Sequence, residues 1–130
     1  MQRTMKCRIP LLLAALLLAG PIVVVGIPAA LAHAFLDRAS PAVGSTVHTP
    51  PSEVRIRFTE ELEPAFSSIG VLDPQGRHVE QGKAKADPGD RKVLEVSLPA
   101  LPPGTYKVIW RVISVDTHRT EGDFTFVVSP

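Results

Sequence analysis

Apolar and polar residues alternate one by one along several short stretches of this chain, and this alternation limits what the chain can fold into. In Glu53–Phe58 every second residue is apolar and the residues between are charged. Leu94–Leu98 alternates again, and Tyr106–Val112 has Tyr, Val, Trp and Val at every second position. A repeat of two is typical of half-buried strands, because successive side chains of a strand point to opposite faces of its sheet. The pattern therefore predicts β-sheet rather than amphipathic helices.

Turn-forming residues divide the region after residue 32 into about seven short strands. Ten of the 13 prolines lie there, mostly beside Asp, Ser or Gly, which breaks local structure. We expect residues 60–66 to form one helical turn or an irregular loop, and residues 81–90 an exposed, mobile loop. The Trp, Tyr and Phe side chains fall on apolar strand faces and are expected in the core. The order of elements predicts an all-β fold, a Greek-key β-sandwich or a small barrel. Further strands are expected at Ala34–Arg38, Ser68–Leu72, Arg77–Glu80 and Phe124–Val128.

The first 32 residues have the form of a secretory signal peptide. A basic start precedes an almost wholly apolar run from residue 9 to residue 32, which ends in Ala30-Leu31-Ala32. A retained membrane anchor is the alternative, because 24 residues can span a bilayer. Three prolines and two glycines within the run favour cleavage. Cleavage after Ala32 would release residues 33–130 as one periplasmic or secreted domain whose first residue is His33.

The composition of residues 33–130 excludes several classes of function. Arg3, Lys6 and Arg8 are three of the 14 basic residues, and the 13 acidic residues all follow residue 32, so the domain carries 11 basic and 13 acidic side chains. A net charge of −2 gives no electrostatic case for nucleic-acid binding. The only cysteine is Cys7 and no methionine follows Met5, so the domain has neither thiolate nor thioether ligands. Ninety-eight residues make one small domain, which argues against a large cofactor enzyme.

An N-terminal histidine and an Asp-x-His triplet are the candidate metal ligands. His33 would offer its free α-amine and its ring Nδ1 to one metal ion, and both groups lose their protons near neutral pH. Asp116 and His118, two residues apart on an extended strand, would point to the same side. Three nitrogens and one carboxylate suit Cu(II), and suit Zn(II) or Ni(II) less well. The alternative is that Asp116 and His118 form a metal-free hydrogen-bonded pair.

Sequence patterns typical of catalytic sites are weaker than the pattern of candidate metal ligands. No G-x-S-x-G nucleophile motif is present. Glu60, Glu61 and Glu63 cluster, which leaves carboxylate-based hydrolysis open, but a domain of this size has little room for the cleft that such chemistry needs.

Five blocks of the chain, in order, resemble the CopC copper-resistance proteins of the bacterial periplasm. They include a leading histidine, an F-T-E end to the second block, and the pattern L-P-x-G-x-Y-x-V-x-W-R-V. The blocks are His33–Gly44, Val54–Glu60, Leu101–Val112, Ser114–His118 and Gly122–Phe126. The resemblance covers essentially all of residues 33–130.

The resemblance implies an immunoglobulin-like sandwich that binds one Cu(II) per mature chain. The ligands implied are the amine and imidazole of His33, with Asp116 and His118, and Glu60 as a weak axial or neighbouring group. Some members of the family also carry a methionine-rich stretch that forms a Cu(I) site. The corresponding region here, residues 72–85, contains His78 and no methionine, so we expect no such site.

The function implied is a copper carrier or buffer in copper resistance or uptake, and not an enzyme. Copper would pass by ligand exchange to a membrane copper transporter of the CopD type, and we expect the carrier to be a monomer. Two alternatives remain open from the sequence. One is a copper mono-oxygenase with an N-terminal histidine site, and the other is a metal-free domain that binds a protein.

Overall fold

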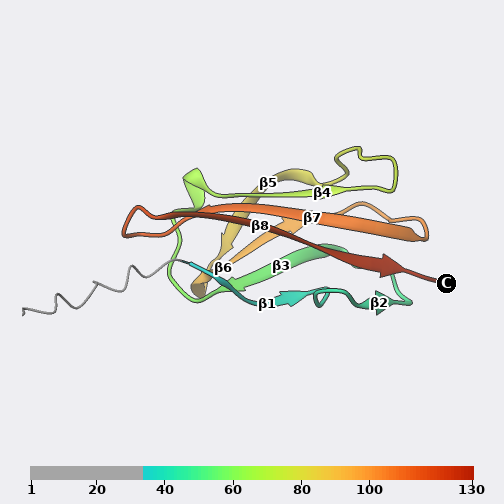
Figure 1. Cartoon of the computed structure of the whole chain (residues 1–130), viewed down its shortest axis with the longest axis horizontal. Helices are drawn as coiled ribbons and strands as arrows, with labels where there is room; N and C mark the ends of the chain where they lie inside the picture. Colours follow the sequence, from blue (N-terminus) through green and yellow to red (C-terminus); the bar gives the residue numbers. More distant parts are fainter. Residues whose placement is uncertain (1–33) are drawn as a thin grey trace, which may run out of the picture.

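The computed structural model describes residues 34–130, which fold almost entirely into β-strands (Figure 1). One turn of 3-10 helix, η1 (Pro64–Phe66), follows the third strand. Residues 34–130 contain no helix that could cross a bilayer. The leader and His33 lie outside the described residues. The strands are β1 (Leu36–Ser40), β2 (Thr46–Val47), β3 (Glu53–Phe58), β4 (Ser68–Leu72), β5 (Gln81–Asp87), β6 (Asp90–Ser97), β7 (Gly104–Ile113) and β8 (Arg119–Val128).

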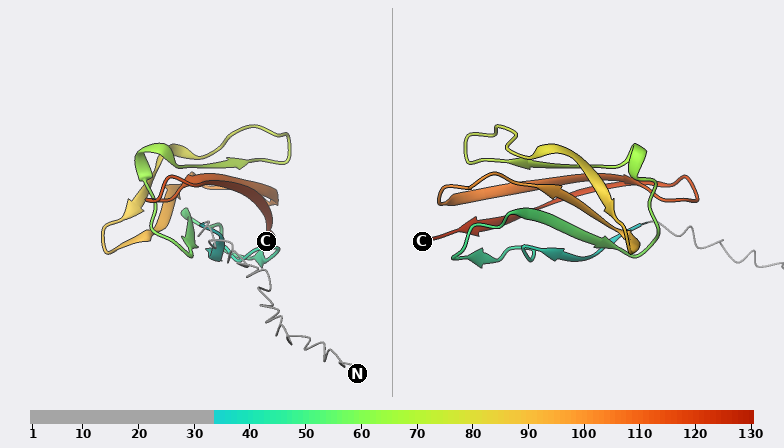
Figure 2. Two further views of the ribbon diagram at one scale, coloured as in Figure 1. Left: turned by 60° about the vertical axis from the view of Figure 1, so that its left-hand side comes forward. Right: turned by 180° about the vertical axis from the view of Figure 1, so that it is seen from behind.

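The strands form two four-stranded sheets that face each other, as the two views of Figure 2 show. One sheet has the order β1-β3-β6-β5 and the other β2-β8-β7-β4. The pairs are antiparallel except β2 with β8, which is parallel. Neighbours in a sheet are often distant in sequence, because the chain crosses from one sheet to the other. The predicted all-β sandwich is confirmed.

The core lies between the sheets and follows from the alternation in the sequence. Every second residue of β7 from Tyr106 to Val112 is buried, as expected. Trp110 packs edge-on against Phe58, with ring centroids 5.2 Å apart and an interplanar angle of 72°. Its ring also lies over Gly122, where a Cβ atom would come within 2.5 Å of the indole. The glycine is therefore needed for this close approach of β8 to the indole ring.

Two stretches differ from the expected secondary structure. Residues 81–90, predicted as a loop, form β5 and the start of β6, joined by a tight turn. Gly, Lys and Ala have little strand preference alone, and pairing with β6 overrides it. Arg77–Glu80, predicted as a strand, makes only an isolated bridge between His78 and Leu72. The side chains of Asp73 and Glu80 bind backbone N–H groups there in place of a ladder.

Not all aromatic side chains are in the core. Phe35 and Phe66 are 58% and 71% exposed, so the expectation that they are buried is wrong. Phe35 lies just before β1, and Phe66 is on η1, outside the alternating strands. Both positions therefore lack a sheet face that could cover them.

Candidate metal centre

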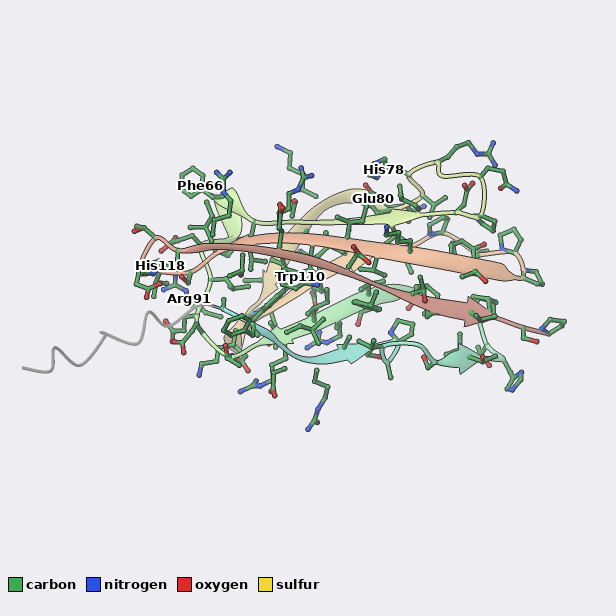
Figure 3. All side chains as sticks on the ribbon, in the orientation of Figure 1. Phe66, His78, Glu80, Arg91, Trp110 and His118 are labelled. Atoms are coloured by element: carbon green, nitrogen blue, oxygen red, sulfur yellow. The ribbon has the colours of Figure 1, made fainter. Side chains whose placement is uncertain are left out.

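Asp116 and His118 lie in the short loop that joins β7 to β8. His118 is at the left-hand end of the sandwich in Figure 3. The N–H of Thr117 donates to the Ser114 carbonyl (2.8 Å), and the N–H of Ser114 donates to the His118 carbonyl (3.0 Å). Thr117 has a φ of +71°, which is unusual for a β-branched residue. The two candidate ligands are thus brought together by a tight turn and not by the extended strand that we expected.

The side chains of Asp116 and His118 face each other. Nδ1 of His118 is 3.1 Å from Oδ2 of Asp116. The hydroxyl of Ser114, a fully buried residue, donates a short hydrogen bond to Oδ1 of the same carboxylate. The Ser114 hydrogen bond, together with the neighbouring His118, holds the pKa of Asp116 below its ordinary value. The Asp116 carboxylate therefore stays ionised, and able to bind a metal cation, to a lower pH than an ordinary aspartate would.

The first described residues are bonded to this end of the sandwich at two points. The hydroxyl of Thr120, two residues after His118, donates to the carbonyl of Ala34 at 2.6 Å. Phe35 and Thr59 exchange two bonds: the Phe35 N–H donates to Oγ1 of Thr59 (3.0 Å), and the Thr59 N–H donates to the Phe35 carbonyl (2.9 Å). Ala34 is completely buried. We call this arrangement of Thr59 and Thr120 around residues 34–35 the N-terminal clamp.

Glu60 follows the clamp residue Thr59, on the loop that leaves β3. This loop is bonded along the base of the β7–β8 turn. The N–H of Val115 donates to the Glu61 carbonyl (3.0 Å), and the N–H of Glu63 donates to the Ile113 carbonyl (2.8 Å). Glu60 is half-buried. It therefore belongs to the same end of the molecule as Asp116 and His118.

The described residues contain only part of the predicted ligand set. In residues 34–130 no three His, Cys, Asp or Glu side chains gather closely enough to hold a metal ion. Asp116 and His118 form a pair, Glu60 lies on the adjoining loop, and His33 is outside the described residues. The remaining histidines lie elsewhere: His48 contacts the Ser129 carbonyl (3.3 Å), and His78 contacts Glu80 (2.9 Å).

Three residues that organise this end were not found from the sequence: Ser114, Thr59 and Thr120. For Ser114 a general signal existed, because serine side chains near turns often form local hydrogen bonds. The two threonines bind residues 24 and 86 positions away, and no local pattern indicates such pairings.

The fold and this end of the molecule define a small β-sandwich protein with a candidate metal-binding loop cluster at one end. A family model described as the CopC domain matches residues 36–129. Protein YobA of Escherichia coli K12 is 38% identical over 102 residues, which cover 78% of this chain and 82% of YobA. Copper transport protein CutJ of Bacillus subtilis is 30% identical over 98 residues, which cover 75% of this chain and 18% of CutJ. The crystal structure of CopC from Methylosinus trichosporium OB3b matches with a TM-score of 0.71 and 40% identity, covering 75% of this chain and 95% of that one.

The chain belongs to the CopC family. Proteins of this family are copper-binding carriers and not enzymes, as the sequence resemblance led us to expect. They are generally periplasmic.

Proposed function

We propose that this chain is an extracytoplasmic carrier that holds one Cu(II) ion per mature chain. Its ligands are the α-amine and imidazole of His33, the imidazole of His118 and the carboxylate of Asp116. Glu60 is a weaker axial or neighbouring group. Residues 1–32 are a signal peptide whose removal creates the chelating amine, and the copper-binding domain is residues 33–130.

The N-terminal clamp is the observation that carries this proposal. The hydroxyl of Thr120, which is two residues after His118, donates to the Ala34 carbonyl at 2.6 Å. Consecutive Cα atoms are about 3.8 Å apart, so a mature chain that starts one residue before Ala34 would carry its α-amine close to this anchor. This closeness supports a chelate shared with Asp116 and His118.

The contacts of the pair support its use as two ligands of one ion. Nδ1 of His118 and Oδ2 of Asp116 lie 3.1 Å apart, so one metal ion can be reached by the imidazole and the carboxylate together. Ser114 holds one oxygen of the Asp116 carboxylate, and carboxylate oxygens keep further lone pairs for a metal.

The donor set supports Cu(II) as the cargo. Nitrogen and carboxylate ligands suit Cu(II), whereas Cu(I) prefers soft sulfur ligands. Residues 33–130 contain no cysteine and no methionine. We therefore propose that the protein carries Cu(II) and has no methionine-type Cu(I) site.

Delivery to a membrane protein is part of the proposal. The region similar to this chain is 18% of CutJ, a longer protein named as a copper transport protein. One relative thus combines a domain of this kind with further sequence in a transport protein. We propose that the present chain passes copper by ligand exchange to a separate membrane copper transporter of the CopD type, and that it does so as a monomer.

Two forms of the purified domain test the N-terminal chelate. One begins at His33 with a free amine, and the other carries one additional residue before it. We expect the free form to bind one Cu(II) with the electron paramagnetic resonance spectrum of a tetragonal, nitrogen-rich site. The extended form should bind far more weakly, because its α-amine is displaced from the His33 ring.

Histidine variants complete the experiment. His118→Ala should weaken Cu(II) binding, whereas His48→Ala and His78→Ala, which remove histidines outside the candidate site, should not. Equal binding by the free and extended forms would show that the N-terminal chelate is wrong. If neither form binds copper, the remaining interpretation is a metal-free domain that binds another protein.

A further inference from the structure

An open groove lies between the edge strands β4 and β5, and neither Asp116, His118 nor Glu60 is among the residues that line it. Its volume is about 800 Å³. Residues 64–69 line one wall, and Glu80 and residues 82–86 line the other. β5 runs obliquely past β4 in both views of Figure 2, and the two strands are not paired. The register of β5 against β6 shifts on both sides of Lys85 and Ala86, which bends the strand away from its neighbour.

The β4 wall presents backbone hydrogen-bonding groups to the groove. Residues of an antiparallel strand alternate between bonding their partner and directing their N–H and C=O to the other side. Val71 directs both groups away from β7: its N–H donates to Oε2 of Glu80 (2.8 Å), and its carbonyl accepts from the Val79 N–H (2.9 Å). Ile69, two residues earlier, has the same orientation, and it lines the groove. Val79 and Glu80, which bond the backbone of Val71, do not reach the backbone of Ile69.

The β5 wall also presents backbone hydrogen-bonding groups to the groove, at Ala86. The N–H of Leu98 donates to the chain just before β3 (2.8 Å), so even-numbered residues of β6 face β3 and odd-numbered residues face β5. Glu95 therefore bonds Lys85, its partner in the register. Ala86, the next residue of β5, directs its N–H and C=O outward. Two strand edges with outward backbone groups are the feature that extended peptides use to add a strand to a sheet.

The side chains of the groove set what can fill it. Half of the lining residues are Ala, Ser or Gly, including Ala65, Ala84 and Ala86, and these leave room for the side chains of an occupant. Lys83 and Lys85 are exposed, and no carboxylate of residues 34–130 lies within 4.0 Å of either ammonium group. The one acidic lining residue, Glu80, is already bonded to Val71 and His78. The groove is therefore cationic and has an apolar floor.

We propose that this groove binds an extended, acidic segment of another protein. The segment would bond the free backbone groups of Ile69 and Ala86, and its carboxylates would face Lys83 and Lys85. The same two lysines would repel a second copy of this edge, which argues against self-pairing. The leader has basic residues and no acid, so it does not complement the groove either. This inference goes beyond copper binding and stands without it.

Nuclear magnetic resonance titration of the folded domain with a designed heptapeptide tests the groove. The probe alternates glutamate and valine and is blocked at both ends, and a second probe has lysine in place of glutamate. We expect the acidic probe to shift the amide signals of Ile69 and Ala86 and to slow the exchange of both amides with solvent. The basic probe should shift neither.

A charge-reversal pair supplies the matched control. Lys83→Glu with Lys85→Glu should weaken binding of the acidic probe by at least about tenfold, since close charge complementarity is lost. Lys92→Glu with Lys107→Glu makes the same change in net charge outside the groove and should keep binding. The proposal is overturned if the acidic probe causes no shift, if the basic probe binds equally well, if shifts centre on another face, or if both double variants lose binding alike.

Discussion

Ser114 organises the candidate metal centre although it offers no strong ligand itself. It is fully buried, its hydroxyl donates to the Asp116 carboxylate, and its N–H and carbonyl bond His118 and Thr117. These bonds hold the turn in which Thr117 adopts a positive φ. The carboxylate and the imidazole are therefore positioned before any metal arrives, which lowers the cost of ordering them on binding.

Replacing this hydroxyl should weaken the proposed copper site without unfolding the domain. Ser114→Ala is expected to lower the affinity for Cu(II) by about 10–100-fold, the usual loss when a partner of a metal ligand is removed. The affinity is measured by competition with a chelator of known strength, and the electron paramagnetic resonance parameters should change with it. Ser68→Ala, at an exposed serine on β4, serves as the control. An unchanged affinity and spectrum for Ser114→Ala would refute the positioning role.

At the scale of elements, the sequence predicted the strands whose residues alternate and missed those that depend on a partner. β3, β4 and β7 were predicted nearly to their ends, because one face of each is apolar. β5, with the sequence Gln-Gly-Lys-Ala-Lys-Ala-Asp, carries no such pattern and is a strand only because β6 pairs with it. The closeness of Asp116 and His118 was predicted, but the tight turn that produces it was not, since a positive φ at a threonine has no sequence signature.

The connection between β4 and β5 gives a test of stability against pH. Oδ1 of Asp73 accepts from the N–H groups of Gln75 and Arg77, each at 2.9 Å, and Oδ2 accepts from Nε of Arg77 (3.0 Å). These bonds, the one from the Arg77 backbone foremost, hold the pKa of Asp73 below its ordinary value. The ionised carboxylate therefore stabilises the folded state above about pH 4, and that contribution is lost as pH falls through the lowered pKa.

We expect Asp73→Asn to lower the free energy of unfolding at pH 7, with the gap from the native sequence closing as pH falls below about 4. Urea unfolding at pH 7, 5 and 3 measures this gap. Asp123→Asn, at a carboxylate 3.9 Å from the Lys107 ammonium, is a control expected to have a smaller effect at pH 7. A gap for Asp73→Asn that stays constant down to pH 3 would contradict the role of the charge.

At the scale of the whole molecule, the proposed ligands come from separate parts of the sandwich. The loop after β3, the β7–β8 turn and the segment before β1 meet at one end through hydrogen bonds of the backbone and of the Thr59 and Thr120 hydroxyls. Unfolding separates them in space. A metal that binds all three parts binds the folded chain alone, so its binding free energy adds to stability.

Copper should therefore raise the melting temperature of the domain that begins at His33. Free Cu(II) at 100 times its Kd adds about 2.7 kcal/mol. For a domain of about 100 residues, each kcal/mol moves Tm by about 4–8 °C. Calorimetry with and without Cu(II) measures the shift, and excess chelator should reverse it. The form with one residue added before His33 should show a smaller rise; an equal rise, or none in either form, would count against the tethered chelate.

The long strand β8 sets the two ends of the described chain apart. It begins at Arg119, beside the clamp at Ala34, and ends at Val128, where Ser129 bonds Val47 of β2 (2.9 Å). Ten extended residues span about 30 Å, and Figure 1 shows the C-terminus at the opposite end from the β7–β8 turn. A bead, electrode or fluorescent reporter joined after Pro130 would thus leave the β7–β8 end facing the solution, whereas the same attachment before His33 would obstruct it. The domain is therefore suited to attachment on a surface through its carboxyl end, as a copper detector whose β7–β8 end faces the solution.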